Sequence, residues 1–445
     1  MLIRRAEKPL TSLMATAVRR WGPGPLQAAG WLLAAVWAAG MFFFSALETH
    51  RVWGLCAMAG YGCAAIAARC RPSARSRTAS VVLALAGAVV LPLLFLVLTG
   101  RAQSEVTVIE RSGLLTLHQV TPYLADPRTV DDYTPYLPGM ALLGIPRALL
   151  GEDGWVARLV GDARIWCASV FLLCLHHGRR VLRRPDPTGH AGRGRLPYGT
   201  AVAALVASPV VALPLCVSGV DLPLTGLCVL ALALAACGRP GPAGFVLAAA
   251  CSLKWTAWPA LAVAVALLGH AHGVRAALRC AGVTVAGTLV LVLPGVLLSP
   301  GAMVQQVLAF PTGRGAVPTP ADSLLPGRLL AGQGALGWYV AVGALALAAL
   351  AVAAWLVLRP PAGLVAAADR LALGLSAGFA LAPAGRFGYL ALPVVLALWA
   401  RLATAGRRTP GSGPVDLPRT TGHGRLPRPL PLSRSVSQPK AATTS

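Results

Sequence analysis

The apolar blocks of this chain, each about as long as a bilayer is thick and separated by short basic stretches, constrain its fold more than any other feature. A helix needs roughly 20 apolar residues to cross the hydrocarbon core of a bilayer. In lipid, only helices and closed barrels satisfy all of their backbone hydrogen bonds, and the sequence shows no strand pattern and no repeat of fixed period. We therefore predict an all-α protein, a polytopic transmembrane helical bundle.

The composition is that of a membrane protein. Of the 445 residues, 56% are hydrophobic and 12% are charged, whereas a soluble chain carries roughly a quarter charged residues. The net charge of +24 comes from Arg residues in short loops and in a Pro-rich tail, which indicates contact with anionic lipids and no nucleic-acid partner. The ten Cys lack metal-ligand spacing, so no metal is predicted from them. No phosphate-binding Gly-x-x-x-x-Gly-Lys-Ser/Thr loop occurs, which disfavours a primary pump.

About twelve spans account for the apolar blocks. The block 242–269 is divided because Lys254 stands at its middle, where a lone Lys would cost at least ~2.5 kcal/mol. The division brings Lys254 to the outer face and keeps the later basic loops inside, as the bias of Lys and Arg toward the cytoplasm requires. The predicted spans are 26–46, 52–68, 79–99, 155–176, 198–217, 223–237, 242–253, 256–269, 280–298, 334–358, 368–383 and 388–402.

Basic clusters set the predicted orientation. The N-terminal segment 1–25 and the tail 403–445 are both basic, so both are placed in the cytoplasm of a multi-pass cell-membrane protein. The tail is rich in Pro, Ser, Thr, Gly and Arg, and is expected to be disordered and in contact with membrane lipids. Two N-terminal helices within 26–78 precede the main bundle, and outer loops are expected at about 100–155 and 299–333.

Charged residues near the outer ends of the spans are the informative positions for chemistry, because each is costly to keep beside lipid. Glu105 follows the third span, Asp131 and Asp132 lie in the long outer loop, Lys254 caps the hairpin, and Arg386 precedes the last span. The predicted topology gathers all of them at one face. A carboxylate can take the proton from an acceptor hydroxyl, and cations can hold a phosphate leaving group. A reaction on a lipid-linked phosphate needs such a convergence.

Five short stretches near span ends form a recognisable set: Glu105-Val-Thr-Val-Ile-Glu-Arg-Ser, Thr121-Pro122-Tyr123, Tyr133-Thr134-Pro135-Tyr136-Leu137-Pro138, Ser252-Leu253-Lys254-Trp255 and Pro383–Tyr389. Together they resemble the GT-C membrane glycosyltransferases, and most of all the actinobacterial, mannosyltransferase-type branch, glycosyltransferase family 87. The resemblance covers about residues 79–402, which it identifies as a catalytic core. Three departures stand out: two additional spans precede the core, Glu105 replaces the more usual Asp, and Arg386 stands where many relatives have His.

This resemblance implies an inverting glycosyltransferase. It would move a sugar, with mannose as the candidate, from a polyprenyl-phosphate donor to a lipid or glycan acceptor at the outer face. Glu105 takes the place of the catalytic base, with Asp131 and Asp132 as the alternative. Lys254 and Arg386 take the places of groups that face the lipid phosphate. No cofactor is implied. A divalent metal at the paired Asp residues stays open as an alternative, but the sequence does not indicate it, because no third oxygen ligand is evident.

Five further residues are candidates for substrate contact. Asp221 lies in a short outer turn and is a candidate sugar ligand, while Tyr133 and Tyr136 belong to the Tyr/Pro motif. Asp162 and Arg164 stand two residues apart near the outer end of the fourth span. For this pair an internal ion pair is the preferred interpretation, and substrate contact is the alternative.

Two other classes of function are weighed against the enzyme. A secondary transporter is expected to carry ionisable residues near mid-membrane and to have two related halves, and the sequence shows neither. A non-catalytic scaffold in cell-envelope assembly would not depend on any outer acid. The gathering of charges at one face favours the glycosyltransferase.

Overall fold

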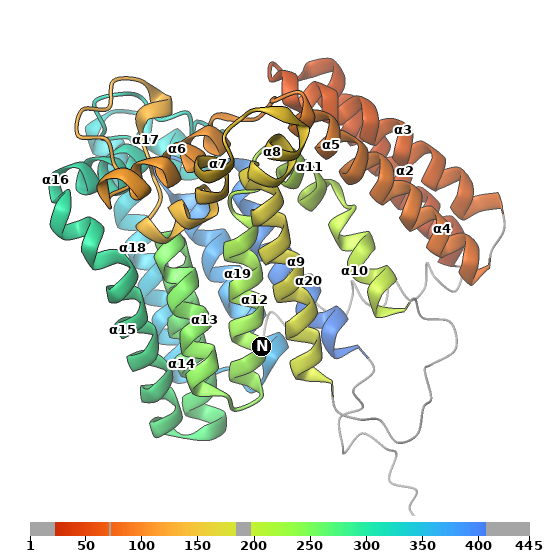
Figure 1. Cartoon of the computed structure of the whole chain (residues 1–445). Coiled ribbons are helices and arrows are strands. Elements are labelled where there is room, and N and C mark those ends of the chain that lie inside the picture. Colours follow the sequence, from red (N-terminus) through yellow and green to blue (C-terminus); the bar gives the residue numbers. More distant parts are fainter. Residues whose placement is uncertain (1–22, 71–72, 184–196, 406–445) are drawn as a thin grey trace, which may run out of the picture. The chain divides into compact units, whose positions relative to one another are not determined.

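The computed structural model describes residues 23–70, 73–183 and 197–405 (Figure 1). Within these ranges the regular structure is helical, with a single isolated bridge between Asp322 and Gly385. The all-α prediction is therefore confirmed. Most of the predicted cytoplasmic N-terminus, the basic stretch 184–196 and the tail from 406 lie outside the described residues.

The first helices pack side by side at one edge of the bundle (Figure 1). Gly60 and Gly87 make the closest approach, since a Cβ on Gly87 would lie 2.4 Å from the Gly60 Cα. Gly87 belongs to a π-helical turn, and the Trp53 ring donates a 2.8 Å hydrogen bond to the Ala88 carbonyl there. We call α2 and α3 the N-terminal hairpin. The elements are α2 (Pro23–Phe44), α3 (Glu48–Cys70), α4 (Ala74–Leu85), η1 (Ala86–Val90) and α5 (Leu91–Leu98).

The predicted long outer loop folds into short helices at one end of the bundle (Figure 1). Asp162 accepts a hydrogen bond from the Arg164 backbone N–H and caps α9, where the chain bends by 46° after α8. The fourth predicted span is therefore broken near its outer end. The elements are α6 (Ser104–Gln119), η2 (Val130–Asp132), η3 (Pro138–Leu143), α7 (Ile145–Leu150), α8 (Gly154–Gly161) and α9 (Ala163–Leu182).

α12 is buried along most of its length and contacts α9, α13, α14, α19 and α20, so it forms the centre of the bundle. α15 and α18 instead leave large apolar side chains exposed, including Val290 and Leu347, as expected for helices that face lipid. The elements here are α10 (Tyr198–Val206), α11 (Pro209–Val217), α12 (Leu222–Ala236), α13 (Pro240–Leu253), η4 (Trp255–Ala257), α14 (Trp258–His272), α15 (Val274–Leu298), α16 (Pro300–Met303), η5 (Val304–Ala309), η6 (Phe310–Thr312), α17 (Pro326–Ala331), α18 (Ala335–Leu358), α19 (Leu364–Leu381), η7 (Phe387–Leu390) and α20 (Ala391–Thr404).

The helix lengths test the predicted spans in part. Among the described residues, seven helices are long and apolar enough to cross a membrane, and counting the bent pairs α8–α9 and α10–α11 as one span each gives nine. α12 and α13 are apolar but shorter, so the count of about twelve stays a prediction. The division of the block at Lys254 is confirmed, because α13 ends at Leu253 and Lys254 has an extended backbone.

Candidate functional site

Two ion pairs lie close together at the ends of four helical elements. Glu105 lies in the first turn of α6, and its carboxylate pairs with Arg386, which immediately precedes η7. Asp221 lies at the start of α12 and pairs with Lys254, in the break after α13. The structure thus brings together the predicted base, both predicted phosphate ligands and the predicted sugar ligand. We call this set, together with Tyr136 and Tyr389, the polar junction.

Lys254 is the most enclosed of the charged groups at the polar junction. Its Nζ lies 2.8 Å from Asp221 Oδ1, and 4.6 Å and 5.7 Å from the ring centroids of Tyr389 and Tyr136. Burial lowers the pKa of the ammonium group, but Asp221, Tyr389 and Glu105 raise it more, and the pKa ends above its ordinary value. Lys254 therefore carries its charge at neutral pH.

The break between α13 and η4, where Lys254 lies, is stabilised by two hydrogen bonds. The Leu253 carbonyl accepts a 3.0 Å hydrogen bond from the Leu137 backbone N–H, and the Cys251 carbonyl accepts one of 3.1 Å from the Trp258 ring. Carbonyl groups at a helix end need such partners. These bonds allow the helix to stop inside an apolar block and turn the Lys254 side chain toward the polar junction.

The Glu105–Arg386 pair is partly open to solvent, with 19% and 28% of the two side chains exposed. Burial lowers the pKa of Arg386, but Glu105 and the nearby tyrosines raise it above its ordinary value. Arg386 binds Glu105 Oε1, whereas the buried Oε2 atom has no hydrogen-bond partner among the described residues. Only one of the two Glu105 carboxylate oxygens is thus engaged in the ion pair.

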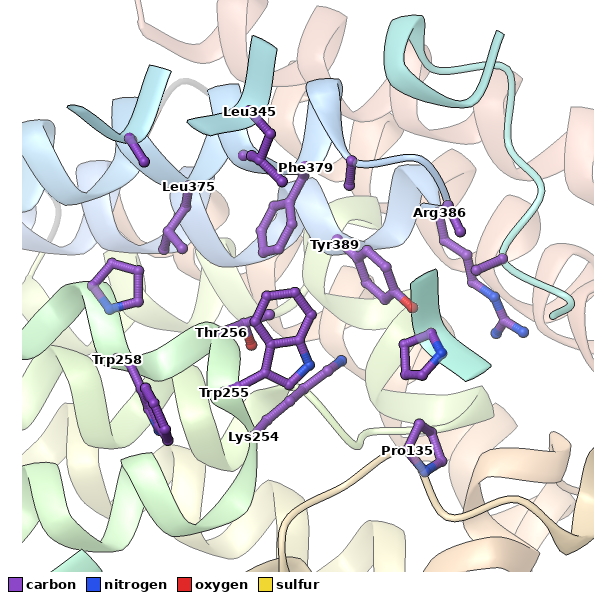
Figure 2. A pocket seen from close by; sticks show the side chains of 18 of the residues that line it. Pro135, Lys254, Trp255, Thr256, Trp258, Leu345, Leu375, Phe379, Arg386 and Tyr389 are labelled. Carbon is purple, nitrogen blue, oxygen red and sulfur yellow. The ribbon is translucent and has the colours of Figure 1, made fainter. Parts of the chain in front are cut away.

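Two cavities meet at the polar junction. The first, of about 570 Å³, and the second, of about 1330 Å³, are both lined by Glu105, Lys254 and Arg386. Away from the junction, the first cavity runs between apolar side chains of α14, α18 and α19. Figure 2 shows Arg386, Tyr389 and Pro135 on one side of a pocket and Leu375 and Trp258 on the other. The second cavity is bounded by the N-terminal hairpin, α11 and α20.

The paired acids of the outer loop line neither cavity. Asp132 closes a capping box with Thr129 and also pairs with Arg111 at 3.1 Å, while the Asp131 carbonyl accepts a hydrogen bond from the same Arg111. Hydrogen bonds from the Thr129 backbone and hydroxyl lower the pKa of Asp132. The structure gives this pair a loop-ordering role and separates it from the polar junction.

The remaining candidates fall into two groups. Tyr136 lines both cavities, and Tyr133 lines the first, where its ring stacks on Phe310 at 4.4 Å. Asp162 and Arg164 form a 2.7 Å ion pair, with no part of the Arg164 side chain exposed and neither residue on a cavity wall. This pair holds the start of α9 and is not a substrate contact in this structure.

Sequence reasoning missed some residues of the site. Tyr389 lies three residues after Arg386 in the same motif, so the motif itself carried the signal. The N-terminal hairpin and the turn between its helices contribute several cavity-lining residues between Trp37 and His50, and nothing in the apolar pattern of α2 indicates that role. In the part of the chain that the structure describes, no three His, Cys, Asp or Glu residues are grouped as metal ligands.

One comparison with known proteins found a relationship. Residues 133–383 match the family model of glycosyltransferase family 87, whereas comparison with curated proteins and with solved structures found no match. The matched segment includes Tyr133, Tyr136, Asp221 and Lys254. It leaves out the N-terminal hairpin and α6, which lie before it, and η7 and α20, which lie after it.

Proposed function

The chain belongs to glycosyltransferase family 87, and we propose that it moves a sugar from a polyprenyl-phosphate donor to a lipid or glycan acceptor at the outer face of the cell membrane. Mannose is the candidate sugar, on the resemblance to mannosyltransferase-type proteins. The observation that carries the proposal is the meeting of two cavities at a junction that holds a carboxylate and two cations.

The first cavity suits the donor, an amphiphile with one anionic end. Lys254 and Arg386 stand at its polar end, and apolar side chains such as Val352, Leu375 and Phe379 line the rest. Cations bind phosphate oxygens by charge-assisted hydrogen bonds, and the apolar wall accepts a hydrocarbon chain. Because α18 and α19, which line the cavity, are of membrane-spanning length, a lipid-linked donor can enter without leaving the bilayer.

The proposed reaction is a single displacement at the anomeric carbon. An acceptor oxygen bonds to that carbon while the bond from the carbon to the phosphate oxygen breaks, and the bonding electrons leave on the phosphate. Glu105 takes the proton of the acceptor hydroxyl. Lys254 and Arg386 stabilise the charge that develops on the phosphate, so no general acid is required. Attack from the opposite face inverts the anomeric configuration.

Arg386 links donor binding to the base. Before the donor binds, Arg386 pairs with Glu105. A phosphate at the cationic end of the first cavity would share the Arg386 guanidinium and loosen that pair, and the carboxylate would then be free to accept a proton. Glu105 is preferred to Asp131 and Asp132 because it lines both cavities and they line neither.

A pair of matched variants tests the role of Glu105. Glu110 lies on the same helix, is partly buried and pairs with Arg147 at 3.2 Å, but lines neither cavity. In membranes supplied with labelled polyprenyl-phosphate-mannose or the glucose analogue, we expect Glu105→Gln to slow single-turnover transfer by about 10²–10⁴-fold, the range of a general base. Glu110→Gln should stay within a few-fold of the wild type. Full transfer by Glu105→Gln, with loss in Asp131→Ala or Asp132→Ala, would reassign the base to the loop.

A further inference from the structure

The two cavities share the polar junction and extend from it between different helices, the first between α14, α18 and α19 and the second between the N-terminal hairpin, α11 and α20. Glu105 and Lys254 line both cavities, whereas Asp221 lines only the second. A hydroxyl group held in the second cavity can therefore reach Glu105 while a donor occupies the first. An inverting displacement needs the acceptor and the donor bound at the same time, because the nucleophile enters opposite the leaving group at the reacting carbon.

The walls of the second cavity change character along its length. Near the polar junction they carry hydroxyl, amide, carboxylate and imidazole groups: Ser45, His50, Gln103, Ser218, Asp221, Asp322 and Ser323. Such groups can donate and accept hydrogen bonds from the several hydroxyls of a sugar. Farther away the walls are apolar, with Trp37, Met41, Leu213 and Val394 coming from helices of membrane-spanning length or from the bent pair α10–α11. The cavity thus fits a molecule with a hydroxylated head and a hydrocarbon anchor.

The N-terminal hairpin is tied to the helix that carries Glu105. His50 Nε2 lies 2.8 Å from Gln103 Nε2, and Gln103 is the N-cap residue immediately before α6. The other ring nitrogen of His50 lies 3.2 Å from the Ser45 hydroxyl. Glu48 pairs with Arg101 at 2.9 Å across the same joint. These contacts fix one wall of the second cavity at a set distance from the proposed base.

From these observations, and resting on the function proposed above, we propose that the second cavity binds the acceptor, a lipid-anchored molecule with a hydroxylated head group. The N-terminal hairpin, which lies outside the family-matched segment, forms the wall that selects it. His50 and Gln103 act as positioning residues for the head group. Related chains that lack this hairpin are expected to take other acceptors.

Two glycines of α2 provide a matched test. A Cβ built on Gly40 or on Gly30 would meet no atom within 4 Å, but Gly40 lines the second cavity and Gly30 lines neither. Gly40→Phe should therefore fill the cavity, and Gly30→Phe should add a ring outside it. Two reactions are followed with labelled polyprenyl-phosphate-sugar: transfer to a chloroform–methanol extract or to the water-soluble glycans of the same cells, and hydrolysis of the donor by water alone.

We expect the wild type to label the lipid extract and not the soluble glycans. Gly40→Phe should raise the extract concentration needed for half-maximal transfer at least ten-fold and leave donor hydrolysis at the wild-type rate. Gly30→Phe should match the wild type in both reactions. His50→Ala, which only removes atoms, should also weaken acceptor binding, and by more than it slows hydrolysis, and it keeps the test valid if Gly40→Phe fails to fold.

Three results would overturn the proposal. Equal loss of transfer and hydrolysis in folded Gly40→Phe and His50→Ala would assign the cavity to the donor. Unchanged transfer in both variants would show that the cavity does not bind the acceptor. Label in the soluble glycans, or in neither fraction while the donor is still hydrolysed, would contradict a lipid-anchored acceptor. If the wild type neither transfers nor hydrolyses, the proposed function itself fails.

Discussion

The Lys254–Asp221 pair permits a test in which the phosphate replaces a missing carboxylate. Only 11% of the Lys254 side chain and 27% of the Asp221 side chain are exposed. Removing one member of a buried pair costs about 3–5 kcal/mol, because the other charge is left uncompensated. We therefore expect Asp221→Asn to lower the thermal stability of the purified protein more than Lys254→Met does, since Lys254 is the more enclosed charge.

Polyprenyl phosphate should reverse this loss selectively. In Asp221→Asn the added phosphate gives Lys254 a new anionic partner, so the melting temperature should rise more on ligand addition than in the wild type. In Lys254→Met, and in the double variant, it should rise less. Lys254→Met should also slow transfer by about 10²–10³-fold, which corresponds to roughly 2.7–4 kcal/mol of lost transition-state stabilisation.

The assay is thermal unfolding in detergent or nanodiscs, with and without polyprenyl phosphate, for the wild type, both single variants and the double variant. The double variant separates stability from function, because removing both charges should recover most of the lost stability without recovering transfer. Equal ligand-induced shifts in Asp221→Asn and Lys254→Met would refute the reasoning, since Lys254 would then not bind the phosphate.

Two further predictions concern the first cavity and the outer loop. A Cβ on Gly378 would meet only Leu345 Cδ1, at 4.0 Å, in the first cavity, so Gly378→Phe should raise the donor KM at least ten-fold. The control Gly343→Phe places its ring on the open face of α18 and should leave the donor KM unchanged. An equal loss of activity in both variants would point to misfolding. The lowered pKa of Asp132 means that its capping box contributes stability above the ordinary Asp pKa of about 3.9 and loses it as the pH falls through the lowered value. Hydrogen exchange should therefore find the Thr129 amide protected at pH 5 and unprotected in Asp132→Ala, and equal protection in both proteins would contradict the capping role.

The sequence predicted the membrane bundle and the charged residues at one end of it for a clear physical reason. A charge beside lipid is costly, so Lys254 and Arg386 stand out against their apolar surroundings. Their partners were harder to foresee. Glu105 and Arg386 are 281 positions apart, and topology alone placed them only at the same face. Their direct pairing depends on how α6 and η7 pack.

The sequence around the paired loop acids contains a signal for a structural role that the prediction of a catalytic role overlooked. Thr129 stands three residues before Asp132, the spacing of a capping box, and the structure shows both of its hydrogen bonds. That spacing was available in the sequence and indicates a structural role for Asp132. The cavity-lining role of α2 in the N-terminal hairpin could not be predicted from the sequence. This helix is apolar around most of its surface, so its pattern does not reveal which neighbour each face covers.

The most direct measurement of the central claim is a cryo-electron microscopy structure of the protein in nanodiscs with bound polyprenyl phosphate. We predict that the phosphate lies between Lys254 and Arg386, within hydrogen-bond distance of both, and that the hydrocarbon chain follows the first cavity between α14, α18 and α19. A phosphate bound away from both cations, or a chain that occupies the second cavity, would contradict the account.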